Sequence, residues 1–130
     1  MIFYQYPDVM DSKYDNVTKK LYKELRKKNR FDHILKIKST LKKIEEVIDL
    51  QPFFDSEQIL PIQYKTGLYE IRYPKTRKDG VCRIYWMYHP QIGNGMIFLD
   101  AEYKPEKKAN RIDSAESRRK EVLNFLKNKK

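Results

Sequence analysis

Two arginines and three lysines of the 130-residue chain have the types and the spacing to surround a phosphate group. Arg72 and Arg83 fall in two successive segments in which polar and apolar residues alternate. The lysines follow the next such segment: Lys104, Lys107 and Lys108. A guanidinium can hold two phosphate oxygens at once, and ammonium groups add further positive charge. These five side chains are therefore the candidate catalytic residues of a site that acts on a phosphodiester.

Two tyrosines and one aspartate near these cations are candidate nucleic-acid-binding residues. Tyr85 lies two residues after Arg83, and Tyr103 directly precedes the first lysine. A tyrosine ring can stack on a base, which contributes roughly 1–3 kcal/mol per base where stacking occurs. Because the chain holds ten tyrosines, packing in a core or an interface is the alternative for each of them. Asp100 could act as a base or could simply pair with a lysine.

The cations also have simpler interpretations. Arg72 could form an ion pair with a helix carboxylate or with a cross-strand partner near Glu70. The three lysines could belong to a solvated turn. If the lysines do crowd together, neighbouring positive charge disfavours the protonated amine, so that one of them could serve as a general base.

Two amphipathic helices precede the segments that carry these residues. Apolar residues recur every three or four positions over about residues 13–28, where Ser12 and Asp15 have capping-box spacing. The same period from Ile34 to Ile48 predicts a second helix, which ends before the next proline. Because the link between the two helices is short, we expect an antiparallel helical hairpin.

Three strands, expected to form an antiparallel meander, carry most of the candidate residues. Alternation and a high content of aromatic and β-branched residues predict strands over 67–73, 81–88 and 96–101. The turn before the third strand contains Asn94 and Gly95, a strong hairpin signal. Residues 49–65 contain two prolines and no steady period, which predicts a loop.

An optional first strand and a final helix complete the expected fold. Residues 2–4 could form an edge strand, and Asn110 with Asp113 can cap a helix that continues to about Leu126. We expect a single domain over residues 1–130. Its class is α+β: a helical hairpin packed on a small antiparallel three- to four-stranded sheet, with a C-terminal helix.

The chain is strongly basic, with 28 Lys and Arg against 18 Asp and Glu and a formal net charge of +10. Residues 13–43 hold 12 basic and 3 acidic residues, and residues 104–130 hold 10 basic and 4 acidic residues. Two basic regions around a nearly balanced centre are typical of a surface that follows phosphates. An acidic protein partner, or helices with solvated outer faces, would suit the same charges.

Composition also excludes several classes of protein. No window approaches the roughly 18 apolar residues of a membrane span, and the first seven residues lack the layout of a secretory signal. We therefore expect a cytoplasmic protein with no membrane partner. Cys82 has no second cysteine to pair with, and His33 and His89 give no zinc-ligand spacing, so we expect no metal site and no cofactor. We interpret His89 as a hairpin residue.

Four local motifs, taken in order and spacing, carry a resemblance to a known family. The motifs are Gly67-Leu68-Tyr69-Glu70-Ile71-Arg72, Arg83-Ile84-Tyr85-Trp86, Ile97-Phe98-Leu99 followed by the three lysines, and Ile112 with Ala115. Together they resemble the RelE/ParE toxin superfamily, and within it the phage-derived HigB-like branch of type II toxin–antitoxin systems. The resemblance covers about residues 14–126 and agrees with the expected sheet on a helical hairpin.

By this resemblance, the chain is expected to be a ribosome-dependent endoribonuclease that cuts messenger RNA in the decoding site. Arg72, Arg83 and the lysines would stabilise the charge on the phosphate while the RNA 2′-hydroxyl attacks it. The implied partners are the ribosome, its message and a cognate antitoxin. The antitoxin is expected to be an acidic or helix-turn-helix protein from the adjacent gene.

Two other functions remain open at this point. The ParE branch of the superfamily poisons DNA gyrase instead of cutting RNA, and a plain RNA- or DNA-binding module would need only the basic surface. The lysine cluster favours the nuclease, because a protein inhibitor has no obvious need of it. Many HigB-like toxins carry a histidine just after the third strand, whereas this chain has Asp100 there, which leaves a different base or an inactive member as alternatives.

Overall fold

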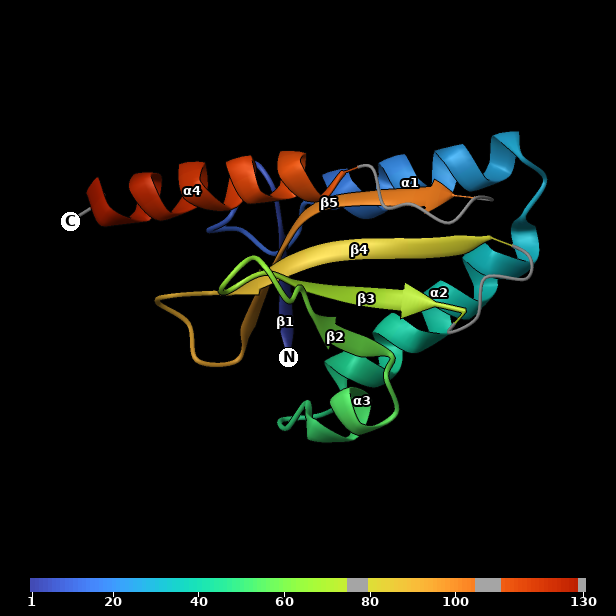
Figure 1. The fold of residues 1–130 in the computed structure, drawn as a ribbon, viewed down its shortest axis with the longest axis horizontal. Helices are drawn as coiled ribbons and strands as arrows, with labels where there is room; N and C mark the ends of the chain where they lie inside the picture. The colour runs from blue at the N-terminus through green and yellow to red at the C-terminus, as the bar shows by residue number, and fades with distance from the viewer. Residues whose placement is uncertain (75–79, 105–110, 129–130) are drawn as a thin grey trace.

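The computed structural model describes residues 1–74, 80–104 and 111–128. Over these residues the chain is α+β, with four helices and a five-stranded mixed sheet in the order β1-β5-β4-β3-β2 (Figure 1). None of the helices in this part of the chain has the length and apolar content needed to cross a membrane.

The sheet has more strands than predicted, and one of its edge strands is parallel to its neighbour and not antiparallel. Its strands are β1 (Ile2–Gln5), β2 (Ile59–Pro61), β3 (Tyr69–Tyr73), β4 (Val81–Tyr88) and β5 (Gly95–Lys104). β2 to β5 are antiparallel neighbours, whereas β1 pairs in parallel with β5. The prediction of an antiparallel three- to four-stranded sheet was therefore wrong, although the optional first strand is confirmed. Because no tight turn joins β1 to β5, no hairpin constrains their relative direction.

Two long helices precede β3, as the periodicity predicted. They are α1 (Asn16–Lys27) and α2 (Phe31–Glu45), and they are followed by the short α3 (Gln51–Asp55). The capping box was wrong, since Asp15 is the N-cap of α1 and its side chain makes no capping hydrogen bond. The prediction that residues 49–65 form a loop was also wrong, because this range contains α3 and β2.

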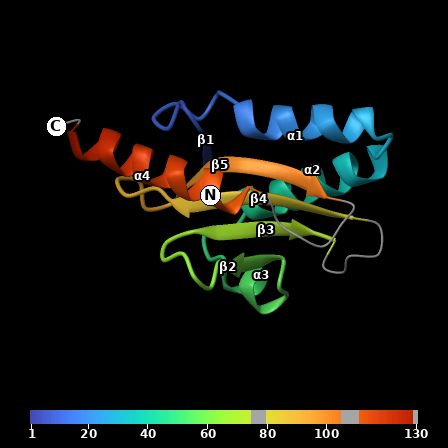
Figure 2. The ribbon, with the colours of Figure 1, turned by 45° about the horizontal axis from the view of Figure 1, so that its top comes forward.

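The helices cover both faces of the sheet, and each face has its own core. Side chains of α1, α2 and α3 pack on the face that presents Ile84 and Trp86. The C-terminal helix α4 (Ile112–Asn128) packs on the opposite face, where Ala115 and Val122 contact a cluster that includes Tyr85. Figure 2 shows α4 in front of the strands near β4 and β5, with α1 apart from it along β5. The face of the sheet on which α4 packs also carries polar side chains that α4 does not replace with apolar contacts. These polar side chains form the candidate site.

Candidate functional site

Arg72 and Arg83 lie directly opposite each other on β3 and β4. Opposed residues of an antiparallel pair project to the same face of the sheet. The two guanidiniums therefore share the face on which α4 packs, as a phosphate-binding site requires.

Glu70 lies between the two arginines and binds both. Its Oε1 is 2.5 Å from Arg72 Nη2, and its Oε2 is 3.3 Å from Arg83 Nε. The side chain of Arg83 is 2 % exposed and that of Glu70 is 5 % exposed, whereas the side chain of Arg72 is 23 % exposed. Arg72 thus forms an ion pair, the alternative weighed from the sequence, but its partner is a residue of its own strand.

Each of the two guanidiniums retains a nitrogen that lacks an acceptor. Arg72 Nε and Arg83 Nη1 are buried and have no hydrogen-bond partner within the described part of the chain. A buried donor without an acceptor costs roughly 1–3 kcal/mol, and more when it is charged, so native proteins rarely leave one. The arginine pair therefore has hydrogen-bonding capacity that Glu70 does not fill.

A β-bulge brings acidic residues of β5 onto this same face. Tyr85 pairs with Asp100, but the next residue of β4 pairs with Phe98, so Leu99 is the additional residue. Beyond the bulge, Glu102 is directly opposite Arg83. The bulge therefore places Asp100 and Glu102 beside the arginine pair.

Tyr85 is held by Glu102 and is fully buried. Its hydroxyl donates to Glu102 Oε2 over 2.7 Å, and the ring belongs to the core beneath α4. Burial, reinforced by that hydrogen bond, raises the pKa of Tyr85 above its usual range. With no exposed ring face, Tyr85 does not have the position that stacking on an RNA base requires.

Asp100 anchors the start of α4 to the sheet. Its Oδ2 accepts hydrogen bonds from Arg111 Nε at 2.7 Å and from Ser114 Oγ at 2.9 Å, and its Oδ1 is 3.6 Å from Arg118 Nη1. The Asp100 side chain is 1 % exposed. Among the described residues it therefore pairs with arginines and not with a lysine, and it is shielded from any solvent-borne substrate.

The interacting side chains of this face form what we call the polar network. Its members are Glu70, Arg72, Arg83, Tyr85, Asp100, Glu102, Arg111, Ser114 and Arg118. The sequence interpretation did not identify five of them as site residues: Glu70, Glu102, Arg111, Ser114 and Arg118. Glu70 could have been found, because it precedes Arg72 by two residues and so shares its face of the strand. Arg111, Ser114 and Arg118 join the network through the docking of α4, for which the sequence offers no signal.

The remaining predicted residues do not all reach this network. Lys104 ends β5 on the same face as Glu102, with its side chain partly exposed. Tyr103, one residue earlier, points to the opposite face, where its ring centroid is 5.5 Å from that of His33. Lys107 and Lys108 lie outside the described residues.

A small pocket adjoins the polar network at the end of β5. It has a volume of about 230 Å³ and lies between α1, β5 and the residue that precedes α4. Its lining residues are Lys20, Glu24, Glu102, Tyr103, Lys104 and Arg111. We call it the β5-end pocket. Two of the predicted site residues, Tyr103 and Lys104, thus line a hollow next to the arginine pair.

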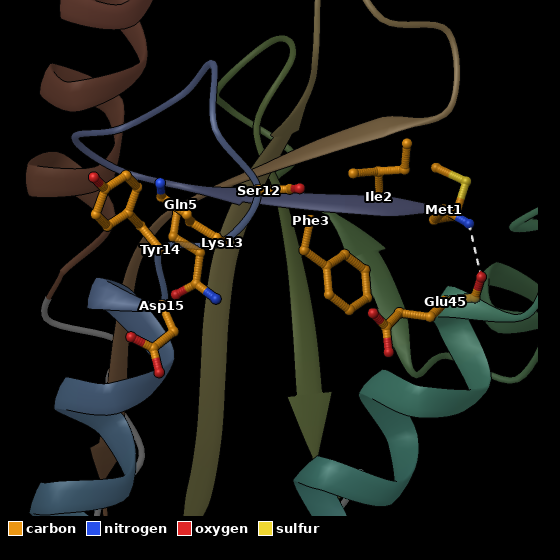
Figure 3. A pocket seen from close by; sticks show the side chains of 9 residues that line it. All are labelled: Met1, Ile2, Phe3, Gln5, Ser12, Lys13, Tyr14, Asp15 and Glu45. Atoms are coloured by element: carbon orange, nitrogen blue, oxygen red, sulfur yellow. Dashed lines mark hydrogen bonds between the residues drawn. The ribbon is translucent and has the colours of Figure 1, made fainter.

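A second hollow, of about 290 Å³, lies near the N-terminus and holds none of the predicted residues. Figure 3 shows its lining side chains around β1 and the start of α1. The ammonium group of Met1 donates to the carbonyl oxygens of Glu45 and Val47, each at 2.9 Å, which holds β1 to the end of α2. In the described segments, no group of three or more His, Cys, Asp or Glu side chains is arranged to hold a metal ion.

No family model, no curated protein and no solved structure matches the chain. The polar network and the β5-end pocket are therefore the features of the chain that bear on its function.

Proposed function

We propose that the protein is the toxin of a type II toxin–antitoxin system, of the RelE/HigB kind, and that it is a ribosome-dependent endoribonuclease acting on messenger RNA in the cytoplasm. One observation supports this most strongly. Arg72 and Arg83 lie side by side, and each has a buried nitrogen with no acceptor among the described residues. Arg72, whose side chain is 23 % exposed, presents the accessible guanidinium of this pair on a chain of net charge +10, which suits a phosphodiester.

In the proposed reaction the RNA supplies its own nucleophile. The 2′-oxygen attacks the adjacent phosphorus, the bond to the 5′-oxygen breaks, and the products carry a 2′,3′-cyclic phosphate and a 5′-hydroxyl. Arg72, the more exposed of the pair, contacts the phosphate oxygens and stabilises the charge that develops on them. Glu70 holds the Arg72 guanidinium in position through one ion pair and is itself fixed by a second ion pair with Arg83. Lysines at the end of β5 and beyond it transfer the protons: Lys104, Lys107 and Lys108.

Asp100 and Tyr85 have a supporting role in this proposal. Both are buried, and both are held by hydrogen bonds within the polar network. They fix β5 and the start of α4 around the arginine pair. A cognate antitoxin from the adjacent gene, acidic or of the helix-turn-helix kind, would neutralise the toxin by covering its basic surface.

A second candidate function is a non-catalytic inhibitor, either of DNA gyrase as in the ParE branch or through plain nucleic-acid binding. The burial of Arg83 against Glu70 favours it. A buried arginine whose charge is matched by a carboxylate is also what a purely structural ion pair would contain. This reading needs no reaction at the arginine pair.

Cleavage of messenger RNA with and without ribosomes separates the two functions. The wild type should produce 2′,3′-cyclic phosphate ends only when ribosomes are present. Arg72→Ala should lower the cleavage rate roughly 10²–10³-fold, as expected for the loss of one donor that stabilises the transition state. Arg26→Ala, an exposed arginine of α1 far along the chain from the site, is the matched control. Intact message in the presence of active ribosomes, together with stalled DNA replication in growth-arrested cells, would instead establish the inhibitor.

A further inference from the structure

The β5-end pocket gathers cations from three separate parts of the chain. Lys20 comes from α1, Lys104 from the end of β5, and Arg111 from the position just before α4. None of the ion pairs between described residues involves Lys20 or Lys104. Their ammonium groups are therefore available to an anion that enters the pocket.

Arg111 is held in place by the polar network while part of it stays open to solvent. Its Nε donates to Asp100 Oδ2 over 2.7 Å, its Nη2 lies 3.4 Å from Ser114 Oγ, and its side chain is 38 % exposed. A guanidinium fixed in this way loses little further side-chain entropy when it binds an anion. The pocket therefore combines one preorganised cation with two flexible ones.

Two carboxylates also line the pocket, and they differ in how they are engaged. Glu102 Oε2 accepts hydrogen bonds from the Tyr85 hydroxyl at 2.7 Å and from the Arg111 backbone N–H at 3.0 Å. Glu24 follows Lys20 by four residues on α1, an order of charges that supports an ion pair less well than the reverse order. Glu24 should therefore oppose the binding of an anion, and this provides a test.

The position of the pocket relates it to the arginine pair. Glu102, which lines the pocket, is directly opposite Arg83 on the neighbouring strand. Adjacent strands are about 4.8 Å apart, so Glu102 is one strand away from Arg83 and two strands away from Arg72. At about 230 Å³ the pocket is smaller than the roughly 300–1,000 Å³ of sites that enclose a whole small molecule. Its size suits a phosphate group and not a complete nucleotide.

We infer that the β5-end pocket binds a backbone phosphate of single-stranded RNA, near the phosphate that Arg72 contacts. The identity of the RNA as the ligand rests on the proposed function. Lys20, Lys104 and Arg111 are the binding residues, and Glu24 limits the affinity. One RNA chain would then cross from the arginine pair over the end of β5 to α1.

Fluorescence anisotropy with a labelled single-stranded 2′-O-methyl RNA tests this inference without ribosomes. The methyl group blocks the attacking oxygen, so binding is measured in the absence of cleavage. Lys20→Ala should weaken binding several-fold and reduce the slope of log affinity against log salt by about 0.7, the value for one lost phosphate contact on a single strand. Glu24→Gln should strengthen binding. Lys23→Ala removes the same charge from an exposed position of the same helix that does not line the pocket, and it should have a smaller effect.

Three results would overturn the inference. One is an equal loss of affinity in Lys20→Ala and Lys23→Ala, which would mean that only the general charge of α1 matters. Another is weaker binding by Glu24→Gln, which would mean that the carboxylate contacts a base. The third is Lys20-dependent binding that does not change when excess inorganic phosphate is added at constant ionic strength, which would mean that the pocket does not hold the RNA through a phosphate. Because no cleavage is measured, failure of the proposed nuclease activity would show only in the ribosome assay.

Discussion

Replacement of Glu70 tests whether the arginine pair is held in place as the geometry indicates. Glu70 binds Arg83 at 3.3 Å and Arg72 at 2.5 Å, and the side chains of Glu70 and Arg83 are 5 % and 2 % exposed. Glu70→Gln keeps the shape of the side chain and removes its charge. Arg83 would then remain buried without the carboxylate of its ion pair.

The expected loss of stability follows from the difference in burial between the two ion pairs. Removing one partner of a buried pair costs about 3–5 kcal/mol, because the remaining charge stays out of water. The pair with Arg72, which is partly exposed, contributes at most about 1 kcal/mol. Since glutamine can still accept one hydrogen bond, we expect Glu70→Gln to lower the free energy of unfolding by about 3 kcal/mol. That is a large part of the roughly 5–15 kcal/mol of a typical domain.

The charge explanation also predicts a rescue. In Glu70→Gln combined with Arg83→Met the buried charge is gone, so the double variant should be within about 1 kcal/mol of the wild type. Urea unfolding followed by the fluorescence of Trp86, which is fully buried, measures all of these variants. Asp32→Asn is the control, because Asp32 is 65 % exposed in its pair with Arg30 and should contribute little. If Glu70→Gln is no more destabilising than this control, or if the double variant is less stable than either single one, the reasoning about the arginine pair is wrong.

Three further predictions concern stability and reactivity away from the polar network. Burial lowers the pKa of His89 below its usual 6.5, so the stability gained from its neutral ring is complete above pH 6.5. That stability is lost as the pH falls toward the pKa of the folded state. The difference in urea midpoint between wild type and His89→Gln should therefore shrink in acid. Burial raises the pKa of the Cys82 thiol to about 12, so a thiol reagent at neutral pH should label the unfolded chain and leave the folded chain unmodified. Gly80 has a φ of +89°, and a Cβ there would be 2.6 Å from Tyr103 Oη. Gly80→Ala should therefore cost about 1–3 kcal/mol in thermal unfolding, whereas Gly93→Ala, with nothing within 4 Å of its Cβ, should be nearly neutral.

The sequence predicts long, periodic elements well and short elements badly. The period of three and four identified α1 and α2, and alternation identified β3, β4 and β5, because many side chains repeat the same signal. β2 has three residues and ends in Pro61, and α3 has five residues with Pro52 in its first turn. Elements this short are stabilised by their neighbours and not by their own sequence. The parallel direction of β1 is likewise decided by the packing of the whole sheet.

For the site, the sequence indicates which residues of one strand share a face, but not which faces meet. Alternation alone places Arg83 and Tyr85 on one face of their strand. The same rule places Asp100 and Tyr103 on opposite faces of the sheet, since they are three residues apart. The meeting of Arg83 with Glu102 depends on the register beyond the bulge at Leu99, which no pattern in the sequence signals.

The charge balance of the polar network indicates that its buried arginines and the cations around it have different roles. Four arginines face three carboxylates, a surplus of one positive charge. Most of the attraction for a polyanion must therefore come from cations at the rim of the network, such as Lys104 and the lysines of α1. The buried ion pairs serve instead to orient Arg72. Replacement of a rim lysine should then reduce affinity and its dependence on salt without changing stability. Replacement of Arg83 should lower the stability of the fold and displace Arg72 at the same time. Any loss of cleavage in that variant must therefore be compared with its loss of folding before Arg83 is assigned a contact with RNA.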